Sequence, residues 1–139
     1  MTIRPYTPAD EAAVVALWQA CELTRPWNDP HKDIARKLAW QPELFLVVAL
    51  DGGVVASAMF GYEGHRGWVN YLAVLPQHQG QGLARALMAR GEALLTAAGC
   101  PKLNLQIRSS NSRVSAFYNH IGYGQDDVVS MGKRLIADP

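Results

Sequence analysis

The order of apolar and polar residues predicts helices in the first third of this chain. Apolar residues recur at helical spacing over residues 14–21. They follow the segment 7–10, whose threonine, proline and aspartate are typical of a helix start. A second helix is predicted over residues 30–40, with Asp29 as its N-cap. Two prolines on either side of Trp27 predict a structured loop between the two helices.

The middle of the chain has the pattern of β-strands instead. Residues 44–50 and 54–62 are rich in β-branched and aromatic side chains, and Asp51-Gly52-Gly53 between them is a strong hairpin signal. A second turn, at residues 63–67, is bracketed by glycines and leads into an apolar strand over residues 68–75. These three strands predict an antiparallel meander.

The last part of the chain returns to helices and then to strands. Helical spacing covers residues 82–98, and polar and apolar residues then alternate over residues 102–107. A short helix is predicted to begin at Ser110-Asn111-Ser112, which supply its N-cap candidates, and residues 128–136 are predicted as a final strand. With an edge strand over residues 2–6, the order is β-α-α-β-β-β-α-β-α-β. This order predicts an α/β (α+β) fold: a mixed, mostly antiparallel central sheet with helices on both faces.

Composition narrows the class of protein. A chain of 139 residues fits one domain over residues 1–139, and its net charge of +1 is scattered, which argues against nucleic-acid or membrane-surface partners. The longest apolar run, residues 44–50, is too short to span a bilayer, and the N-terminus has no signal-peptide pattern. Cys21 and Cys100 match no metal-ligand spacing. These features predict a cytoplasmic protein with reduced thiols and no metal site.

The segment Gln79-Gly80-Gln81-Gly82-Leu83-Ala84 carries the clearest chemical signal. It follows an apolar strand and opens a long amphipathic helix. A helix begins with unpaired N–H groups and a positive dipole end, and glycines let a phosphate approach them closely. The residues 79–85 are therefore predicted to form an anion-binding turn, called the phosphate cradle below. A glycine pair of this kind also occurs in ordinary turns, so its neighbours decide the interpretation.

Those neighbours carry a resemblance to a known family. QGQGLA after LAVLP resembles the acetyl-CoA pyrophosphate loop of the GNAT N-acetyltransferases, and RSSNSRVSAFYNHIGY resembles their later strand-to-helix element. Both motifs stand in the family's order and spacing, and the resemblance covers almost the whole chain. It implies the GNAT fold. TRPWNDP and GYEGHRG are similar to the small bacterial YpeA-like branch of this family.

The resemblance also implies a donor and the residues that bind it. The donor is acetyl-CoA, and no metal is needed. Backbone groups of one strand would bind the pantetheine amides as a false strand and polarise the thioester carbonyl. Tyr118 would donate a proton to the leaving thiolate as general acid. The implied cofactor-binding residues are Leu72, Ala73, Val74, Gln79, Gly80, Gln81, Gly82, Leu83, Ala84, Arg85, Asn111, Phe117 and Tyr118.

The sequence does not identify one residue as the general base that removes a proton from the acceptor. An amine acceptor is protonated in water, so a base or a desolvating pocket must supply its neutral form. Related acetyltransferases of the ribosomal-protein type carry a glutamate where this chain has Gln106, and a neutral amide cannot accept the proton. Glu63 and His65 are the alternative candidates, either directly or through water. The competing hypothesis, favoured by Gln106, is a non-catalytic acetyl-CoA-binding module.

The resemblance implies that the acceptor is a primary amine, on a small molecule or at a peptide or protein N-terminus. In this family the loop between the first two helices usually covers the acceptor side. An apolar ring beside an amide and a carboxylate suits a cationic amine. Arg25, Arg66 and Arg108 could equally bind a carboxylate on an amino acid or peptide. The sequence leaves the acceptor and the oligomeric state open, with a homodimer as one option. The substrate-binding candidates are Trp27, Asn28, Asp29 and Tyr71.

Overall fold

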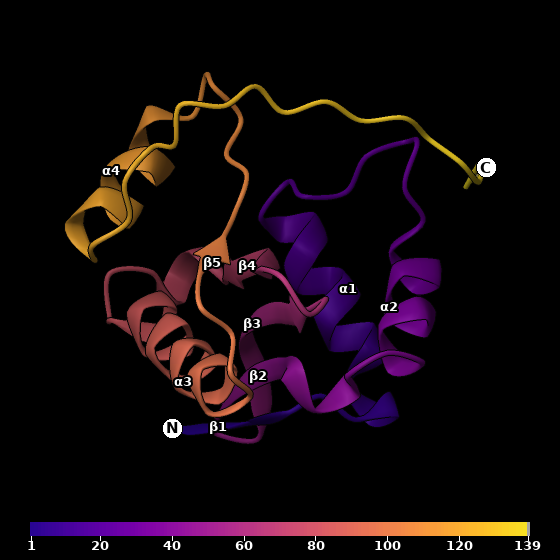
Figure 1. Cartoon of the computed structure of the whole chain (residues 1–139). Coiled ribbons are helices and arrows are strands. Elements are labelled where there is room, and N and C mark those ends of the chain that lie inside the picture. The colour runs from indigo at the N-terminus through magenta and orange to yellow at the C-terminus, as the bar shows by residue number, and fades with distance from the viewer. Residues whose placement is uncertain (139) are drawn as a thin grey trace.

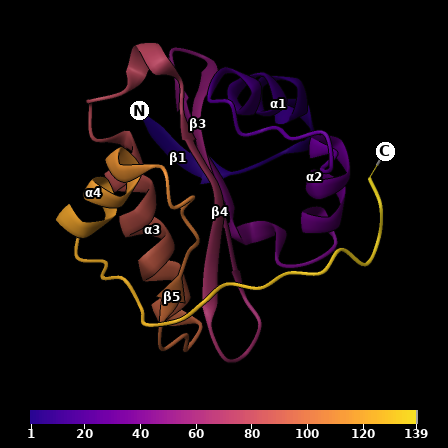
Figure 2. The same ribbon diagram turned by 90° about the horizontal axis from the view of Figure 1, so that it is seen from above.

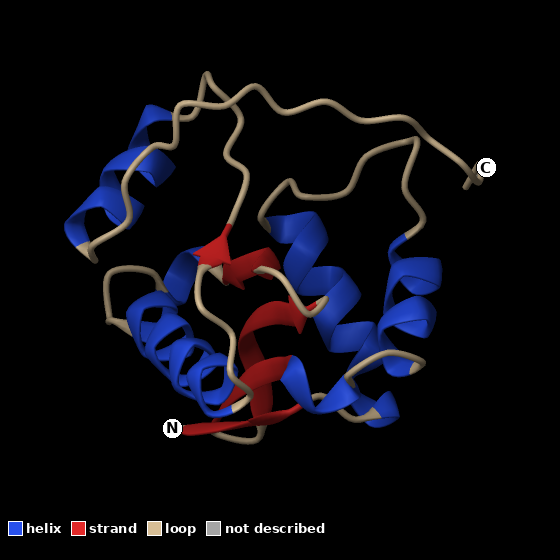
Figure 3. Cartoon of the chain, viewed as in Figure 1, coloured by secondary structure: helices blue, strands red, loops and turns tan. Residues whose placement is uncertain are grey.

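A five-stranded sheet in the order β1-β2-β3-β4-β5 forms the centre of the computed structural model, which describes residues 1–138. Neighbouring strands are antiparallel except β4 and β5, which are parallel. This arrangement confirms the meander and the mixed, mostly antiparallel sheet (Figure 3). The strands are β1 (Thr2–Pro5), β2 (Phe45–Leu50), β3 (Gly53–Tyr62), β4 (Gly67–Val74) and β5 (Leu103–Asn104).

Helices cover both faces of this sheet, as the sequence predicts. Figure 2 shows α1 and α2 on one side of β4, and α3 and α4 on the other. The side chain of Asp29 caps α2 by accepting the His31 and Lys32 amides at 2.9 and 3.3 Å, so the expected N-cap is confirmed. The helices are α1 (Glu11–Ala20), α2 (Pro30–Leu38), α3 (Leu83–Ala97) and α4 (Ser112–His120), with short 3₁₀ turns at Pro8–Asp10, Pro42–Leu44 and Pro76–His78.

Two apolar cores lie on the two faces of the sheet. Successive side chains of a strand point to opposite faces. Phe45 and Val47 of β2 therefore pack in the core that includes α1, while Leu46 and Val48 pack in the core that includes α3. Helix α3 approaches β3 so closely at Gly91 that an added Cβ would lie 2.1 Å from the Phe60 ring. Glycine is needed there to let the helix pack on the sheet.

The C-terminal end departs from the sequence-based expectation. Residues 128–136 were expected to form a strand, but residues 124–138 form an extended segment without strand pairing, here called the C-terminal strap. It runs from α4 across one end of the molecule to α2 (Figures 1 and 2). Val128 and Val129 are 78% and 87% exposed. Their β-branched side chains favour a strand, but a strand also needs a neighbour that supplies backbone hydrogen bonds, and the strap has none.

Strand β5 is also shorter than the predicted strand over residues 102–107. Its two residues pair with Gly67 and Trp68 at the start of β4. Beyond these two pairs the chain leaves β4, so residues 105–107 have no ladder to join. The two diverging segments leave a gap at this edge of the sheet, and the candidate site is built there.

Candidate functional site

A cavity of about 1260 Å³ lies where β4 and the chain after β5 diverge. Both faces of the sheet contribute to its wall. The cavity therefore joins the α3–α4 side of the molecule to the α1–α2 side. Residues that line it and enter the argument below are Arg25, Asn28, Asp33, Arg36, Lys37, Asn70, Tyr71, Leu72, Gln106, Arg108, Asn111 and Tyr118.

Strand β4 is bulged where it borders the cavity. Its register with β3 shifts between Ser57 and Met59, and Tyr71 has a left-handed φ of 53°. A side chain other than glycine rarely adopts this conformation, so the surroundings must hold it. The Ser57 hydroxyl, fully buried, donates to the Tyr71 carbonyl at 3.1 Å and accepts the Trp18 indole N–H at 3.0 Å. This buried chain of hydrogen bonds fixes the bulge, which turns backbone groups of β4 out of the ladder and toward the cavity.

The Tyr71 side chain, a predicted substrate-binding residue, is held on the α1–α2 side of the cavity. Its ring stacks on Trp18 with 3.7 Å between the ring centroids, and its hydroxyl donates to Asp33 at 2.6 Å. Burial and the neighbouring Asp33 carboxylate raise the pKa of the Tyr71 hydroxyl, which therefore stays protonated and keeps donating this bond. Sequence reasoning missed Asp33, because an acidic residue on α2 is not distinguishable from a solvated helix residue by spacing alone.

The phosphate cradle has the geometry that its sequence predicts. Gly80 and Gly82 have φ values of 79° and 80°, and an added Cβ on either would meet no atom within 4 Å. Helix α3 begins directly after Gly82, and the Ala86 amide is the first to bond back, to the Gly82 carbonyl at 3.0 Å. The preceding helical amides are thus available to an anion. The cradle does not line the cavity, and the end of β4 connects the two.

The Gln79 side chain closes the turn between β4 and the cradle. Its amide donates to the carbonyl of Val74, the last residue of β4, at 3.0 Å. This bond ties the first residue of the cradle to the strand. The path from the bulge at Tyr71 to the open glycines is therefore a continuous, fixed segment of backbone.

Tyr118 faces the cavity from the opposite side. It is 7% exposed, and its ring meets Phe117 and Tyr123 edge-on. Burial raises the pKa of its hydroxyl to about 12. Within residues 1–138 this hydroxyl forms no hydrogen bond and keeps contact with solvent, so it is available to a molecule bound in the cavity that Tyr118 lines.

Asn111 and Gln106 line the cavity on the same side as Tyr118. The Asn111 side chain caps α4 by accepting the Val114 amide at 3.2 Å, as the sequence predicts. The Gln106 amide donates to the Ser130 hydroxyl of the C-terminal strap. Gln106 therefore holds the strap, and its amide supplies no basic group to the cavity.

The structure gives Glu63 a role in its own turn. Its carboxylate accepts the backbone amides of His65 and Arg66, and these bonds lower the pKa of the carboxyl. Glu63 is exposed and lines a smaller cavity of about 170 Å³ that also touches Met59 and Asn70, whereas His65 lines neither cavity. A carboxylate with a lowered pKa is a weaker proton acceptor.

Replacing Glu63 by Gln tests whether this carboxylate is the general base. Because the two backbone bonds occupy it, we expect the acidic limb of the kcat/KM profile against pH to keep its position, with at most a few-fold change in rate. Initial rates of acetyl transfer from about pH 6 to 9 measure the profile. A flattened acidic limb would instead assign proton removal to Glu63.

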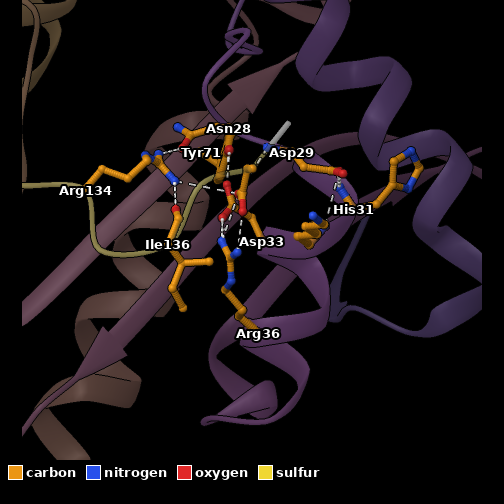
Figure 4. A network of polar contacts seen from close by, with 10 residues as sticks. Asn28, Asp29, His31, Asp33, Arg36, Tyr71, Arg134 and Ile136 are labelled. Carbon is orange, nitrogen blue, oxygen red and sulfur yellow. Dashed lines mark hydrogen bonds and ion pairs between the residues drawn. The ribbon is translucent and has the colours of Figure 1, made fainter.

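The loop between α1 and α2 contributes Asn28 to the cavity, but not Trp27 or Asp29. Trp27 is 53% exposed, and the Asp29 carboxylate is used to cap α2. The Arg134 side chain donates to the Asn28 side-chain oxygen, so the C-terminal strap covers this loop (Figure 4). Of the substrate-binding candidates, the structure therefore brings Asn28 and Tyr71 to the cavity.

Asp138 fastens the strap to α2. Its side chain is fully buried and accepts two hydrogen bonds from Arg36, at 2.6 and 3.0 Å, and one from the Asp29 amide at 3.3 Å. The Arg36 guanidinium is the main cause that lowers the pKa of the Asp138 carboxyl to about 2. Neither Arg36 nor Asp138 stood out in the sequence, because the two residues lie 102 positions apart.

We expect Asp138→Asn to free the strap from α2. The pKa of Asp138 is lowered in the folded chain, so its stabilising contribution is present above its ordinary value of 3.8 and is lost as the pH falls toward about 2. At neutral pH, trypsin should cleave after Lys133 or Arg134 several-fold faster in the variant. Asp127→Asn, also in the strap but without an ion pair in residues 1–138, is the control. Equal cleavage of both variants and the parent would contradict the fastening role.

Neither a metal cluster nor a membrane helix is found within the described part of the chain. No group of three or more His, Cys, Asp or Glu side chains in residues 1–138 could hold a metal ion. No helix there is long and apolar enough to cross a membrane.

Comparisons with known proteins agree with this geometry. Residues 12–123 match the acetyltransferase (GNAT) family. A protein of Yersinia enterocolitica named as an acetyltransferase is 49% identical over 138 residues, which cover 99% of this chain and 98% of the relative. A solved structure from Agrobacterium tumefaciens superposes with a TM-score of 0.79 at 22% identity, covering 96% of this chain and all of that one. The ribosomal-protein-S18-alanine N-acetyltransferase of Escherichia coli has a TM-score of 0.74 at 25% identity, covering 90% and 78%.

Proposed function

Because this chain belongs to the GNAT family of acetyltransferases, we propose that it transfers the acetyl group of acetyl-CoA directly to a primary amine. The chain is an acyltransferase, and acetyl-CoA is the donor in its family. The observation that carries the proposal is the continuous backbone from the cavity at Tyr71, through the end of β4 at Val74 and the 3₁₀ turn Pro76–His78, to the phosphate cradle. A single-domain, cytoplasmic enzyme is part of this proposal.

Acetyl-CoA binding is assigned to the cradle and to β4. The open glycines at positions 80 and 82 and the free amides of α3 are suited to a pyrophosphate. Leu72, Ala73 and Val74 would bind the pantetheine amides through their backbone. With the pyrophosphate at the cradle, the thioester would reach the bulge at Tyr71, and Asn111 would lie beside the pantetheine arm.

The chemical step is attack of the amine on the thioester carbonyl. The neutral amine nitrogen forms the C–N bond and the C–S bond breaks. The nitrogen then loses one proton to solvent, and the departing CoA thiolate takes up one proton. Tyr118 is assigned as the donor, since its unpartnered hydroxyl faces the cavity and its pKa of about 12 keeps the proton on it at neutral pH. Backbone N–H groups that the bulge turns out of the ladder would stabilise the negative charge on the carbonyl oxygen.

The acceptor would enter from the α1–α2 side of the cavity. Asn28, Asp33 and Tyr71 lie there, and the Asp33 carboxylate would attract a protonated amine. A peptide or protein N-terminus and a small amine both fit this description. The Escherichia coli structure, named for its action on a ribosomal-protein alanine, supports the first of the two.

A non-catalytic acetyl-CoA-binding module is the second candidate, and the neutral Gln106 in the cavity favours it. Release of free thiol from acetyl-CoA, measured on purified protein with amines, amino acids and N-terminal peptides, separates the two. Turnover with any acceptor supports the enzyme. Tight acetyl-CoA binding without turnover across the panel would favour the module.

A further inference from the structure

Lys37 is a buried cation on the wall of the cavity. It lies in the last turn of α2 and is 8% exposed. Its ammonium group lies close to β3, since an added Cβ on Gly61 would be 3.5 Å from Nζ. Within residues 1–138 Nζ forms no hydrogen bond or ion pair, and it keeps contact with solvent. Because the rest of the residue is buried, the charge is less well hydrated than on an open surface, and an anionic ligand that reaches Nζ would stabilise it.

The other cations on this side of the cavity already have partners. Arg36 pairs with Asp33 and Asp138, and Arg25 donates to two backbone carbonyls of its own loop. Arg108 is exposed to water. Lys37 is therefore the buried cation that a ligand can neutralise.

Asp33 and Lys37 form a pair of opposite charges along the same face of α2. They are four residues apart, so their Cβ atoms lie about 6 Å from one another. Both line the cavity, yet they form no ion pair with each other. Asp33 contacts the Tyr71 hydroxyl at the bulge, whereas Lys37 lies toward Gly61, farther along the sheet. A dipolar molecule can match this arrangement, with its ammonium at Asp33 and its carboxylate at Lys37.

We propose that Lys37 binds a carboxylate of the acceptor, so that the enzyme prefers amines that carry a carboxylate several bonds from the nitrogen, as in an N-terminal glutamate. This substrate class rests on the proposed acetyl transfer. The Cβ atoms of the two residues lie about 6 Å apart, and from there Asp33 reaches the Tyr71 hydroxyl of β4 while Lys37 reaches Gly61 of β3. A ligand that contacts both charges therefore needs its carboxylate several bonds from its nitrogen, which suits a glutamate side chain better than the shorter distance within a free α-amino acid.

Two matched peptides test the proposal. Glu-Ala-Ala-amide and Gln-Ala-Ala-amide differ only in the charge of the first side chain. The parent protein should acetylate the glutamate peptide with a kcat/KM about 10- to 100-fold higher, as expected for a charge-assisted contact in a buried site. In Lys37→Met, which keeps the apolar stem, the ratio should fall to near one. Lys32→Met, an exposed position on the same helix, should keep the ratio of the parent.

Failure of this proposal can be separated from failure of the proposed function. Equal acetylation of both peptides by the parent would overturn the role of Lys37 and leave acetyl transfer intact. If no amine were acetylated, calorimetric binding of the two peptides to the CoA-saturated protein would decide. Tighter binding of the glutamate peptide, lost in Lys37→Met, supports the carboxylate site, and equal binding overturns it. Thermal unfolding checks the fold of Lys37→Met, whose melting temperature should stay close to that of the parent because the buried apolar stem is kept. If the melting temperature falls, Lys37→Gln is used in place of Lys37→Met.

Discussion

Replacing Gly82 by Trp should weaken acetyl-CoA binding by at least about 100-fold. The backbone at Gly82 opens into space that contains no atom within 4 Å of an added Cβ, and a large ring would fill the place assigned to the pyrophosphate. Each charge-assisted hydrogen bond lost there is worth about 1.5–3 kcal/mol, so two lost bonds account for a change of this size. Titration calorimetry with acetyl-CoA and CoA measures it.

Gly52→Trp is the matched control for this experiment. Gly52 lies in the β2–β3 hairpin, has the same φ of 80° as Gly82, and also has no atom within 4 Å of an added Cβ. Both variants therefore carry similar backbone strain, while one alone alters the cradle. Unchanged affinity in a folded Gly82→Trp protein, or an equal loss in Gly52→Trp, would contradict the assignment of the cradle.

Tyr118→Phe should lower kcat by tens of fold and leave acetyl-CoA affinity nearly unchanged. The substitution keeps the ring that packs against Phe117 and Tyr123 and removes the hydroxyl that faces the cavity. General acid catalysis contributes about 10²- to 10⁴-fold, and CoA is a fairly good leaving group, so the lower end of that range is expected. With a pKa of about 12, the hydroxyl should produce no alkaline limb below that pH in the parent.

Tyr123→Phe is the control for the loss of a phenol hydroxyl from a half-buried ring beside Tyr118. Tyr123 packs against Tyr118 but donates its hydroxyl to Glu92 on α3, away from the cavity. We expect its stability to fall and its kcat to stay close to that of the parent. If Tyr118→Phe kept the kcat of the parent on a proven acceptor, Tyr118 would have no role as general acid and would serve only in packing.

Most of the fold follows from local sequence. The hairpin signal at residues 51–53, the glycine-bracketed turn at residues 63–67 and the helical spacing after the cradle determine the meander and α3. Asp29 and Asn111 act as the predicted N-caps because capping depends on neighbours within one turn. These features are predictable because each depends on residues close in the chain.

The C-terminal strap could not be predicted in the same way. Its valines favour a strand, but whether a strand forms depends on a partner elsewhere in the fold. In this structure the strap is held instead by side chains, through Lys102 with Asp126 and Arg36 with Asp138. Such long-range ion pairs leave no periodic signal in the sequence.

The sequence predicted one part of the candidate site and missed the other. The cradle, Asn111 and Tyr118 belong to motifs with fixed spacing, whereas the bulge at Tyr71 interrupts a segment that reads as a regular strand. Lys37 reads as a surface residue of a charged helix, and its burial depends on how α2 packs beside β3. Tertiary packing therefore creates the α1–α2 side of the cavity, which local patterns do not encode.

Transfer of a labelled acetyl group tests the central claim most directly. The purified protein is incubated with deuterated acetyl-CoA and a primary amine, and mass spectrometry measures the labelled amide while a thiol assay measures free CoA. If Tyr118 protonates the leaving thiolate during acetyl transfer at the cavity, one labelled amide forms for each thiol released. Both rates should then fall together in Tyr118→Phe. Thiol release with labelled acetate and no labelled amide, or no release at all from a protein that binds acetyl-CoA, would contradict it.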